Sequence, residues 1–143
     1  MLVKTQSERI VEYWDMIRHA VIKGMPNLSP RIDVDKVANN ILEAAMKGIA
    51  DIWMLGSEGK LYAIASTVQT IDMIGGSNAL VIYSLFGYRD MPKELWADAI
   101  STLEKYARAK GCLNISAFTD VPAVVNIAKG LGFNMVNFLT KEV

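Results

Sequence analysis

The fold of this chain is decided by one stretch, Glu104-Lys105-Tyr106-Ala107-Arg108-Ala109-Lys110-Gly111-Cys112. This stretch is the C-terminal part of a longer predicted helix. Pro92 suits the first position of that helix, and Gly111 suits the residue just after its last turn. The apolar residues between them recur at helical spacing: Leu95, Trp96, Ala99, Ile100, Leu103 and Ala107. Directly after the stretch, Leu113 to Phe118 alternates like a strand. A long helix that leads into a strand is therefore expected over residues 92–118.

Upstream of this helix, the sequence has the pattern of strands. The run Ala79 to Phe86 is apolar almost throughout, which is typical of a central strand covered on both faces. Ile52 to Leu55 and the β-branched run Leu61 to Ile71 flank the turn residues Gly56 to Gly59, so residues 52–71 are predicted to form a hairpin. A second turn, Met73 to Asn78, joins this hairpin to the third strand.

The first 50 residues predict two helices. Ile10, Trp14, Ile17 and Val21 recur at the spacing of one helical face, with Thr5 and Glu8 as a capping box and Gly24 as the end. The composition of Met25 to Pro30 predicts a loop. Asp33 is expected to cap the second helix, and Gly48 to end it. Its apolar face comprises Val34, Val37, Ala38, Ile41, Leu42 and Ala45.

At the C-terminal end, Thr119 or Asp120 is expected to cap a short helix from Pro122 to Leu131. Gly132 and Phe133 then lead to a last strand at Val136–Lys141. The predicted order is α-α-β-β-β-α-β-α-β, with no internal repeat and no linker. It favours one α+β domain over residues 1–143: a single mixed, mostly antiparallel sheet with helices on both faces.

Composition narrows the classes of function. The chain has 143 residues, 52% hydrophobic, and its 15 basic and 15 acidic side chains leave no net charge. Disorder is excluded, and no basic face for nucleic acid is expected. A single Cys112 and a single His19 supply no disulfide framework and no metal site. Without an apolar run of membrane length or a signal-peptide pattern, we expect a cytoplasmic protein, and the balanced charge suits association with itself or with a protein partner.

Over residues 5–143, the chain resembles the GNAT N-acetyltransferase superfamily. The stretch Glu104–Cys112 is typical of that family's long helix, and Lys129-Gly130-Leu131-Gly132-Phe133 is similar to its closing motif. The resemblance implies an α/β sandwich that binds acetyl-CoA. In the family, backbone N–H groups at the start of the long helix and a glycine-rich loop hold the pyrophosphate. The pantetheine arm pairs with the gap between the central and fifth strands, and a tyrosine of the short helix often protonates the leaving thiolate.

Three positions of the family pattern are lost. The loop corresponds to Met91–Trp96, where Glu94 and Trp96 stand in the glycine positions. Pro92 removes one N–H group, and the Glu94 carboxylate on the first turn competes with a phosphate for the positive end of the helix dipole. The tyrosine position is Ala128, which has no proton to give. The acetyl-CoA loop is therefore degenerate, which makes the cofactor doubtful, and no metal is expected.

The candidate cofactor-binding residues lie around this loop and on the fifth strand: Gly87, Tyr88, Arg89, Met91, Lys93, Asn114 and Ser116. Each has a plainer interpretation. Gly87 is either a bulge or a strand end, and Asp90 and Glu94 can neutralise Arg89 and Lys93 on a solvated surface. Asn114 and Ser116 belong either to the cleft or to a half-exposed strand. For catalysis, the general base would be a carboxylate or a water held by strand groups, for which Tyr83 and Ser84 are the candidates.

Two functions are compatible with these residues. The first is a GNAT-like domain that acts without catalysis as a binding or assembly protein. This degenerate loop is similar to that of small GNAT-like proteins of tailed phages, which implies the host cytoplasm or the virion for such a protein. The second is an atypical acetyl-CoA-dependent N-acetyltransferase that acts on an amine by direct transfer.

Overall fold

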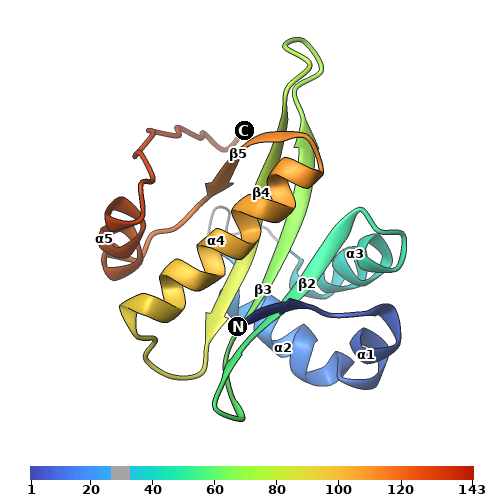
Figure 1. The fold of residues 1–143 in the computed structure, drawn as a ribbon. Coiled ribbons are helices and arrows are strands. Elements are labelled where there is room, and N and C mark those ends of the chain that lie inside the picture. The colour runs from blue at the N-terminus through green and yellow to red at the C-terminus, as the bar shows by residue number, and fades with distance from the viewer. Residues whose placement is uncertain (27–32) are drawn as a thin grey trace.

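The computed structural model describes residues 1–26 and 33–143 and contains one five-stranded sheet with the order β1-β2-β3-β4-β5 (Figure 1). Neighbouring strands are antiparallel except β4 and β5, which are parallel. The strands are β1 (Leu2–Lys4), β2 (Ala50–Ser57), β3 (Lys60–Ile71), β4 (Asn78–Gly87) and β5 (Cys112–Ala117). The helices are α1 (Ser7–Glu12), α2 (Trp14–Gly24), α3 (Val34–Met46), α4 (Lys93–Ala109) and α5 (Pro122–Gly130).

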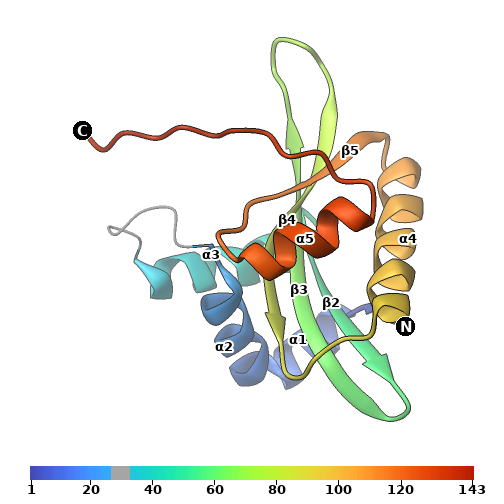
Figure 2. The same ribbon diagram turned by 90° about the vertical axis from the view of Figure 1, so that its left-hand side faces the viewer.

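The helices cover both faces of the sheet, as the sequence predicted. Figures 1 and 2 show α4 on one face, α1 to α3 on the other, and α5 beyond the β5 edge. Each covered face has its own apolar cluster. The cluster under α4 includes Trp53, Leu80 and Leu103, and the cluster under α1 to α3 includes Ile17, Ile52 and Ile64. The predicted fold class, a mixed and mostly antiparallel sheet between helices, is confirmed.

The two N-terminal helices keep most of their predicted buried faces, although Val34, which was expected on the buried face of the second helix, is exposed. They also begin differently. Ile10, Ile17 and Val21 are fully buried. The first helix is divided at Tyr13, whose φ of −107° and ψ of 22° separate α1 from α2. The predicted capping box is wrong, because the N-cap residue is Gln6 and no side chain caps α1. The carboxylate of Asp33, in contrast, caps α3 as expected by accepting from the N–H groups of residues 35 and 36.

The predicted turns form as tight hairpins. Glu58 and Gly59 connect β2 to β3 with positive φ angles of 51° and 73°, the combination that a two-residue turn of type I′ requires. Between β3 and β4, the Asp72 carboxylate accepts hydrogen bonds from the N–H groups of Ile74 and Gly75 at 3.0 Å. These two backbone bonds lower the pKa of Asp72.

Four features differ from the predictions or lie outside them. The predicted cap of α5 at Thr119 or Asp120 is wrong, because the N-cap residue is Val121 and no side chain caps this helix. The strand β1 was not predicted; it pairs Leu2 with Leu55 at the edge of the sheet. The strand predicted at Val136–Lys141 does not form: residues 133–143 have no regular structure and pair with no strand in the described part of the chain. Of the predicted loop Met25–Pro30, residues 27–30 lie outside the described residues.

The end of α2 lies directly on β4. A Cβ atom placed on Gly24 would be 2.7 Å from the backbone carbonyl carbon of Leu85. Gly24 is the last residue of α2, so the predicted helix end is confirmed. The close approach is a further reason for glycine here, since any side chain would push the helix away from the sheet.

Candidate functional site

The central strand β4 contains a β-bulge at Tyr83. Ser66 of β3 pairs with Ser84 and Thr67 pairs with Ile82, so Tyr83 is one extra residue on β4. The extra residue changes the alternation of the strand. Leu80, Ile82 and then Leu85 contact the cluster under α4, with a spacing of two residues before the bulge and three across it.

The bulge lies where β4 and β5 separate. Parallel pairing of β4 with β5 runs from Asn78 and Cys112 to Ile82 and Ala117. Beyond that point, residues 84–87 of β4 pair with β3 on one side and, among the described residues, have no ladder partner on the other. We call residues 83–87 the open half of β4. Its free N–H and C=O groups can accept an extended chain as an added strand.

The structure decides between the two interpretations of Gly87. The bulge belongs to Tyr83, and Gly87 is the last residue of β4, where it pairs with Ala63. The strand-end interpretation is therefore correct and the bulge interpretation is wrong. The sequence could not separate them, because a bulge depends on which residue of β3 faces which residue of β4.

The two candidate catalytic residues lie at the bulge itself. Tyr83 is half-buried and contacts the cluster under α1 to α3. Ser84 is 3% exposed, and its hydroxyl oxygen lies 2.5 Å from that of Ser66 in a mutual hydrogen bond. The Ser84 hydroxyl is thus committed to the core, so it is a poor group for holding a reactive water.

The loop between β4 and α4 is held by Tyr62 of β3. The N–H group of Tyr88 donates to the backbone oxygen of Tyr62 at 2.8 Å, and the Arg89 guanidinium lies 5.4 Å from the centre of the Tyr62 ring. The Tyr88 ring meets Phe86 edge to face at 5.0 Å, and burial raises the pKa of its hydroxyl. Met91 contacts the cluster under α4. The loop therefore has a fixed path from the open half of β4 to the helix.

The start of α4 presents backbone donors. Pro92 is the N-cap residue and supplies no side-chain cap, while its carbonyl accepts from the N–H groups of Leu95 and Trp96. The first N–H groups of a helix have no partner inside the helix, so those of Lys93 and Glu94 are available to an anion. No ion pair within the described part of the chain joins Arg89 or Lys93 to Asp90 or Glu94.

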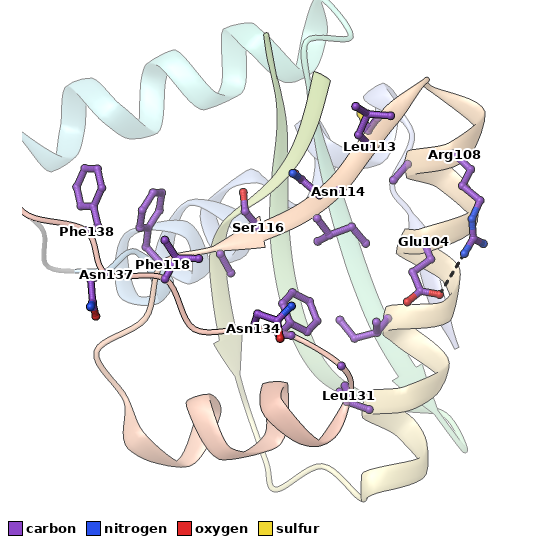
Figure 3. A pocket seen from close by; sticks show the side chains of 18 residues that line it. Glu104, Arg108, Leu113, Asn114, Ser116, Phe118, Leu131, Asn134, Asn137 and Phe138 are labelled. Carbon is purple, nitrogen blue, oxygen red and sulfur yellow. Dashed lines mark ion pairs between the residues drawn. The ribbon is translucent and has the colours of Figure 1, made fainter. Parts of the chain in front are cut away.

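Asn114 and Ser116 lie on the paired part of β5 rather than beside the open half of β4. Asn114 is opposite Ala79 and Ser116 is opposite Val81. Both line a cavity of about 710 Å³ between α4, β5 and residues 131–138 (Figure 3). The structure thus separates these two residues from the loop candidates, which lie at the other end of β4.

The sequence did not predict this cavity. On the α4 side, Arg108 Nη2 lies 3.9 Å from Glu104 Oε2, and at the far end the rings of Phe118 and Phe138 lie 5.2 Å apart. Leu113 is 78% exposed. The signal in the sequence was the apolar pattern at 135–139, which predicted a strand but not the space beside it.

The remaining residues with possible chemistry have structural roles. His19 is exposed and meets Phe86 edge to face at 5.6 Å, and Cys112 is a free thiol buried at the start of β5. Among residues 1–26 and 33–143, no three His, Cys, Asp or Glu side chains gather in a way that could hold a metal ion. In the same ranges, no helix has the length and apolarity to cross a bilayer.

Solved structures of other proteins share this arrangement of helices and strands. The chain superimposes over its full length on a predicted acetyltransferase with acetyl-CoA from Clostridium acetobutylicum, with a TM-score of 0.71, 12% identity and 95% of that chain covered. It also superimposes fully on a possible acetyltransferase from Clostridium difficile 630 (TM-score 0.68, 11% identity, 95% of that chain) and on glucosamine-6-phosphate N-acetyltransferase from Arabidopsis thaliana (0.64, 14%, 97%). No protein-family model and no curated protein sequence matches the chain. Over its whole length, this chain has the fold of the GNAT N-acetyltransferases.

Proposed function

We propose that this chain binds acetyl-CoA, with the pantetheine arm along the open half of β4. The observation that supports the proposal is the combination of the Tyr83 bulge with the end of β4–β5 pairing at Ile82 and Ala117. Among the described residues, it leaves the backbone of residues 83–87 without a ladder partner on the β5 side, on the edge that the family uses for this arm. Bound acetyl-CoA supplies a thioester whose acetyl group an amine can attack directly.

The pyrophosphate would lie at the start of α4. The N–H groups of Lys93 and Glu94 point out of the first turn, and Arg89 is held nearby over the Tyr62 ring. Two features weaken this site: Pro92 has no N–H group to donate, and the Glu94 carboxylate repels a phosphate. We therefore expect a modest affinity rather than the tight binding of a glycine-rich loop.

The residues of this chain offer little for proton transfer. Ala128 stands where the family often has a tyrosine, and the Ser84 hydroxyl is bonded to Ser66. In transfer to an amine, the amine nitrogen would bond to the carbonyl carbon of the acetyl group and the carbon–sulfur bond would break. The proton lost by the nitrogen would pass through water to the leaving CoA thiolate, so the products are the amide and free CoA thiol. Tyr83 remains the candidate for positioning that water, because it is the residue that the bulge adds at the edge of the gap.

A second function is a binding or assembly role without catalysis, including a role in a phage particle. It is favoured by Glu94 and Trp96 in the glycine positions of the loop and by Ala128 in the short helix. A protein of this kind keeps the fold but has no use for an efficient cofactor site.

One set of melting curves separates the two functions. A ligand that binds the native state raises the melting temperature by mass action, so millimolar acetyl-CoA should raise the Tm of the wild-type chain. Arg89→Glu should reduce the shift, whereas Lys110→Glu, at the far end of α4, should leave it unchanged. Glu94→Gly combined with Trp96→Gly should enlarge it.

The absence of any Tm shift, in the wild type and in the double glycine variant alike, would overturn the proposal of acetyl-CoA binding and leave the assembly role. A shift without release of free thiol in the presence of a panel of amines would mean binding without transfer.

A further inference from the structure

The turn between β3 and β4 exposes three apolar side chains. Ile71, Met73 and Ile74 are 64%, 90% and 99% exposed. Asp72 holds the turn in one shape through four hydrogen bonds to the backbone of residues 74–77. We call residues 71–77 the hairpin tip. A turn that is already ordered and displays apolar side chains is suited to enter an apolar recess, because little conformational freedom is lost on binding.

The hairpin tip projects from one end of the sheet. The pairing of β2 with β3 ends at Ala50 and Val68, and the pairing of β5 with β4 starts at Cys112 and Asn78. Residues 69–77 therefore extend past both neighbouring strands, and Figures 1 and 2 show the hairpin standing out beyond the helices. The tip is accessible to another molecule from several sides.

The opposite end of the sheet carries a shallow groove, which we call the end groove. It lies between β1, β2 and the start of β3, and its apolar side chains are Met1, Val3, Met54 and Leu61. Its volume of about 430 Å³ corresponds to about fourteen waters at about 30 Å³ each, so two apolar side chains fit into it. The chain thus combines an apolar projection at one end with an apolar recess at the other.

The charges of the two ends are complementary. Asp72 is the only charged residue in the segment 69–79, and the end groove includes Lys60 and Glu58 of the β2–β3 turn. Among residues 1–26 and 33–143, neither Asp72 nor Lys60 belongs to an ion pair. Attraction between these two groups would orient the tip in the groove, with Asp72 away from Glu58. A tip without a basic residue is poorly suited to an anionic lipid surface.

We propose that the hairpin tip of one copy of this chain enters the end groove of the next copy, so that the copies join end to end. The apolar side chains of the tip would contact Val3 and Leu61, and Asp72 would approach Lys60. The tip and the groove lie at opposite ends of β3 (Figure 1). Each added copy therefore presents a new free tip or groove, and the contact builds an open chain of copies rather than a closed dimer.

The length of β3 sets the spacing of the copies, and the size of the contact sets its strength. With 12 residues at about 3.3 Å each, β3 separates the two ends by about 40 Å, which is the expected axial repeat. A contact of a few side chains is small, so we expect a dissociation constant on the order of 0.1–1 mM. This contact gives the assembly role a specific surface, and it uses none of the residues proposed to bind acetyl-CoA.

Sedimentation velocity from micromolar to millimolar protein is the first test. The average mass of the wild type should rise past that of a dimer without reaching a fixed value, and Met73→Asp with Ile74→Asp should remain a monomer. The matched control is Val34→Asp with Val121→Asp. It adds the same charge at two exposed apolar residues at helix starts, where aspartate is well tolerated, and should associate like the wild type. A wild-type monomer at millimolar protein, or a closed dimer, would overturn the proposal.

Mixing two variants tests whether the contact joins a tip to a groove. Val3→Asp blocks the groove, and the Met73→Asp, Ile74→Asp variant lacks the tip, so each should be a monomer by itself. Their mixture has one intact tip and one intact groove per pair and should give a heterodimer and nothing larger. A mixture that stays monomeric, or that forms longer assemblies, would contradict the proposal. Circular dichroism checks that each variant is folded.

Lys60→Glu covers the case in which Val3→Asp does not fold, because Lys60 is exposed in a turn. It places a second carboxylate against Asp72 and should weaken association about tenfold. Asp72→Asn keeps an oxygen that can accept the hydrogen bonds of the turn but removes the charge, and should weaken association several-fold at low salt. Unchanged association in both variants would contradict the charge pairing.

Phosphatidylcholine vesicles test the other use of an apolar tip. Under the proposal, the wild type and the Met73→Asp, Ile74→Asp variant should both remain in solution when the vesicles are sedimented. Sedimentation of the wild type with the vesicles but not of the variant, together with a monomer at every protein concentration, would assign the tip to a lipid surface and overturn the proposal.

Discussion

Ser66 on β3 and Ser84 on β4 share a hydrogen bond of 2.5 Å between two buried hydroxyl groups. The pair lies beside the register shift, where Tyr83 adds one residue to β4. Because each hydroxyl satisfies the other, neither is left unpaired in the core. The bond ties β4 to β3 at the level where its other side separates from β5.

Removing both members of this pair should cost less than the sum of the two single losses. Ser66→Ala or Ser84→Ala leaves one buried hydroxyl without a partner, which should lower the free energy of unfolding by about 1–3 kcal/mol. The double variant should lose less free energy of unfolding than the two single variants lose together. Urea denaturation of all four proteins measures this coupling, and strictly additive losses would mean that the hydroxyls do not depend on one another.

Tyr106→Phe should destabilise the contact between α4 and β2. The Tyr106 hydroxyl donates a hydrogen bond to the Asp51 carboxylate, whose side chain is 15% exposed and lies 3.9 Å from Lys4 Nζ. Losing a bond to a charged group lowers the free energy of unfolding by about 1.5–3 kcal/mol. Urea denaturation at neutral pH tests this. Tyr13→Phe, an exposed tyrosine at the α1–α2 break, should change stability by less than about 0.5 kcal/mol.

The same bond should be lost at high pH. Burial and the neighbouring Asp51 raise the pKa of Tyr106 above its ordinary value. The contribution of this tyrosine is therefore complete below about pH 10, the pKa of an unfolded tyrosine, and declines as the pH rises above it. The difference in stability between the wild type and Tyr106→Phe should narrow above about pH 10. If the stability difference between the two proteins stayed constant above about pH 10, ionisation of Tyr106 would not be what breaks the hydrogen bond to Asp51.

Gly24→Ala should loosen the packing of α2 on β4. The new Cβ would meet the Leu85 backbone at 2.7 Å, so the helix must shift, and we expect a loss of about 1–3 kcal/mol. Gly130→Ala is the matched control because a Cβ there meets nothing within 4 Å. That variant should be neutral or stabilise the chain by up to about 1 kcal/mol. Thermal unfolding distinguishes the two, and equal melting temperatures would contradict the close approach.

Two of the predicted helix caps, at Asp33 and at Thr5, should differ in energy. Asp33→Ala removes a carboxylate that accepts two N–H groups of α3, and should cost about 0.5–2 kcal/mol. Thr5→Ala removes no cap, because Gln6 is the N-cap residue of α1, and should change little. The measurement is chemical denaturation of both variants. A comparable loss of stability in Thr5→Ala would mean that Thr5 does cap the first helix.

The charge on the loop should tune acetyl-CoA affinity, if the proposed function holds. Glu94→Gln removes a carboxylate from the first turn of α4 and should tighten binding by a few-fold, up to about tenfold. Arg89→Gln should weaken binding by a similar factor, and Glu58→Gln in the β2–β3 turn should have no effect. Calorimetric titration with acetyl-CoA at low salt measures all three. Unchanged affinity for both loop variants would place the ligand elsewhere.

Much of the fold could be predicted because its signals are local. Residues close to one another in the sequence determine the apolar faces of α2, α3 and α4. They also determine the hairpin turns at Glu58 and Asp72. The strand β1 was missed because three residues are too few to show a period of two. The break between α1 and α2 at Tyr13 could not be predicted, because no proline or glycine lies near it in the sequence.

The candidate site was predictable in part. The loop residues Tyr88 to Lys93 could be assigned to the start of α4 from the helical pattern that follows them. The position of Arg89 over the ring of Tyr62 could not be predicted, because Tyr62 belongs to a distant strand. Asn114 and Ser116 could be assigned to β5, but the sequence does not say which edge of the strand carries the cavity.

By itself, the sequence determined the positions of α2 to α5 and of β2 to β5, the lack of net charge, and the loss of the glycines and the tyrosine of the family pattern. These properties depend on residues within a few turns of each other. The tertiary structure alone decided the bulge at Tyr83, the open half of β4 and the absence of a strand at Val136–Lys141. The physical reason is that a strand and its register exist only with a partner, whose backbone supplies the hydrogen bonds that the segment cannot supply itself.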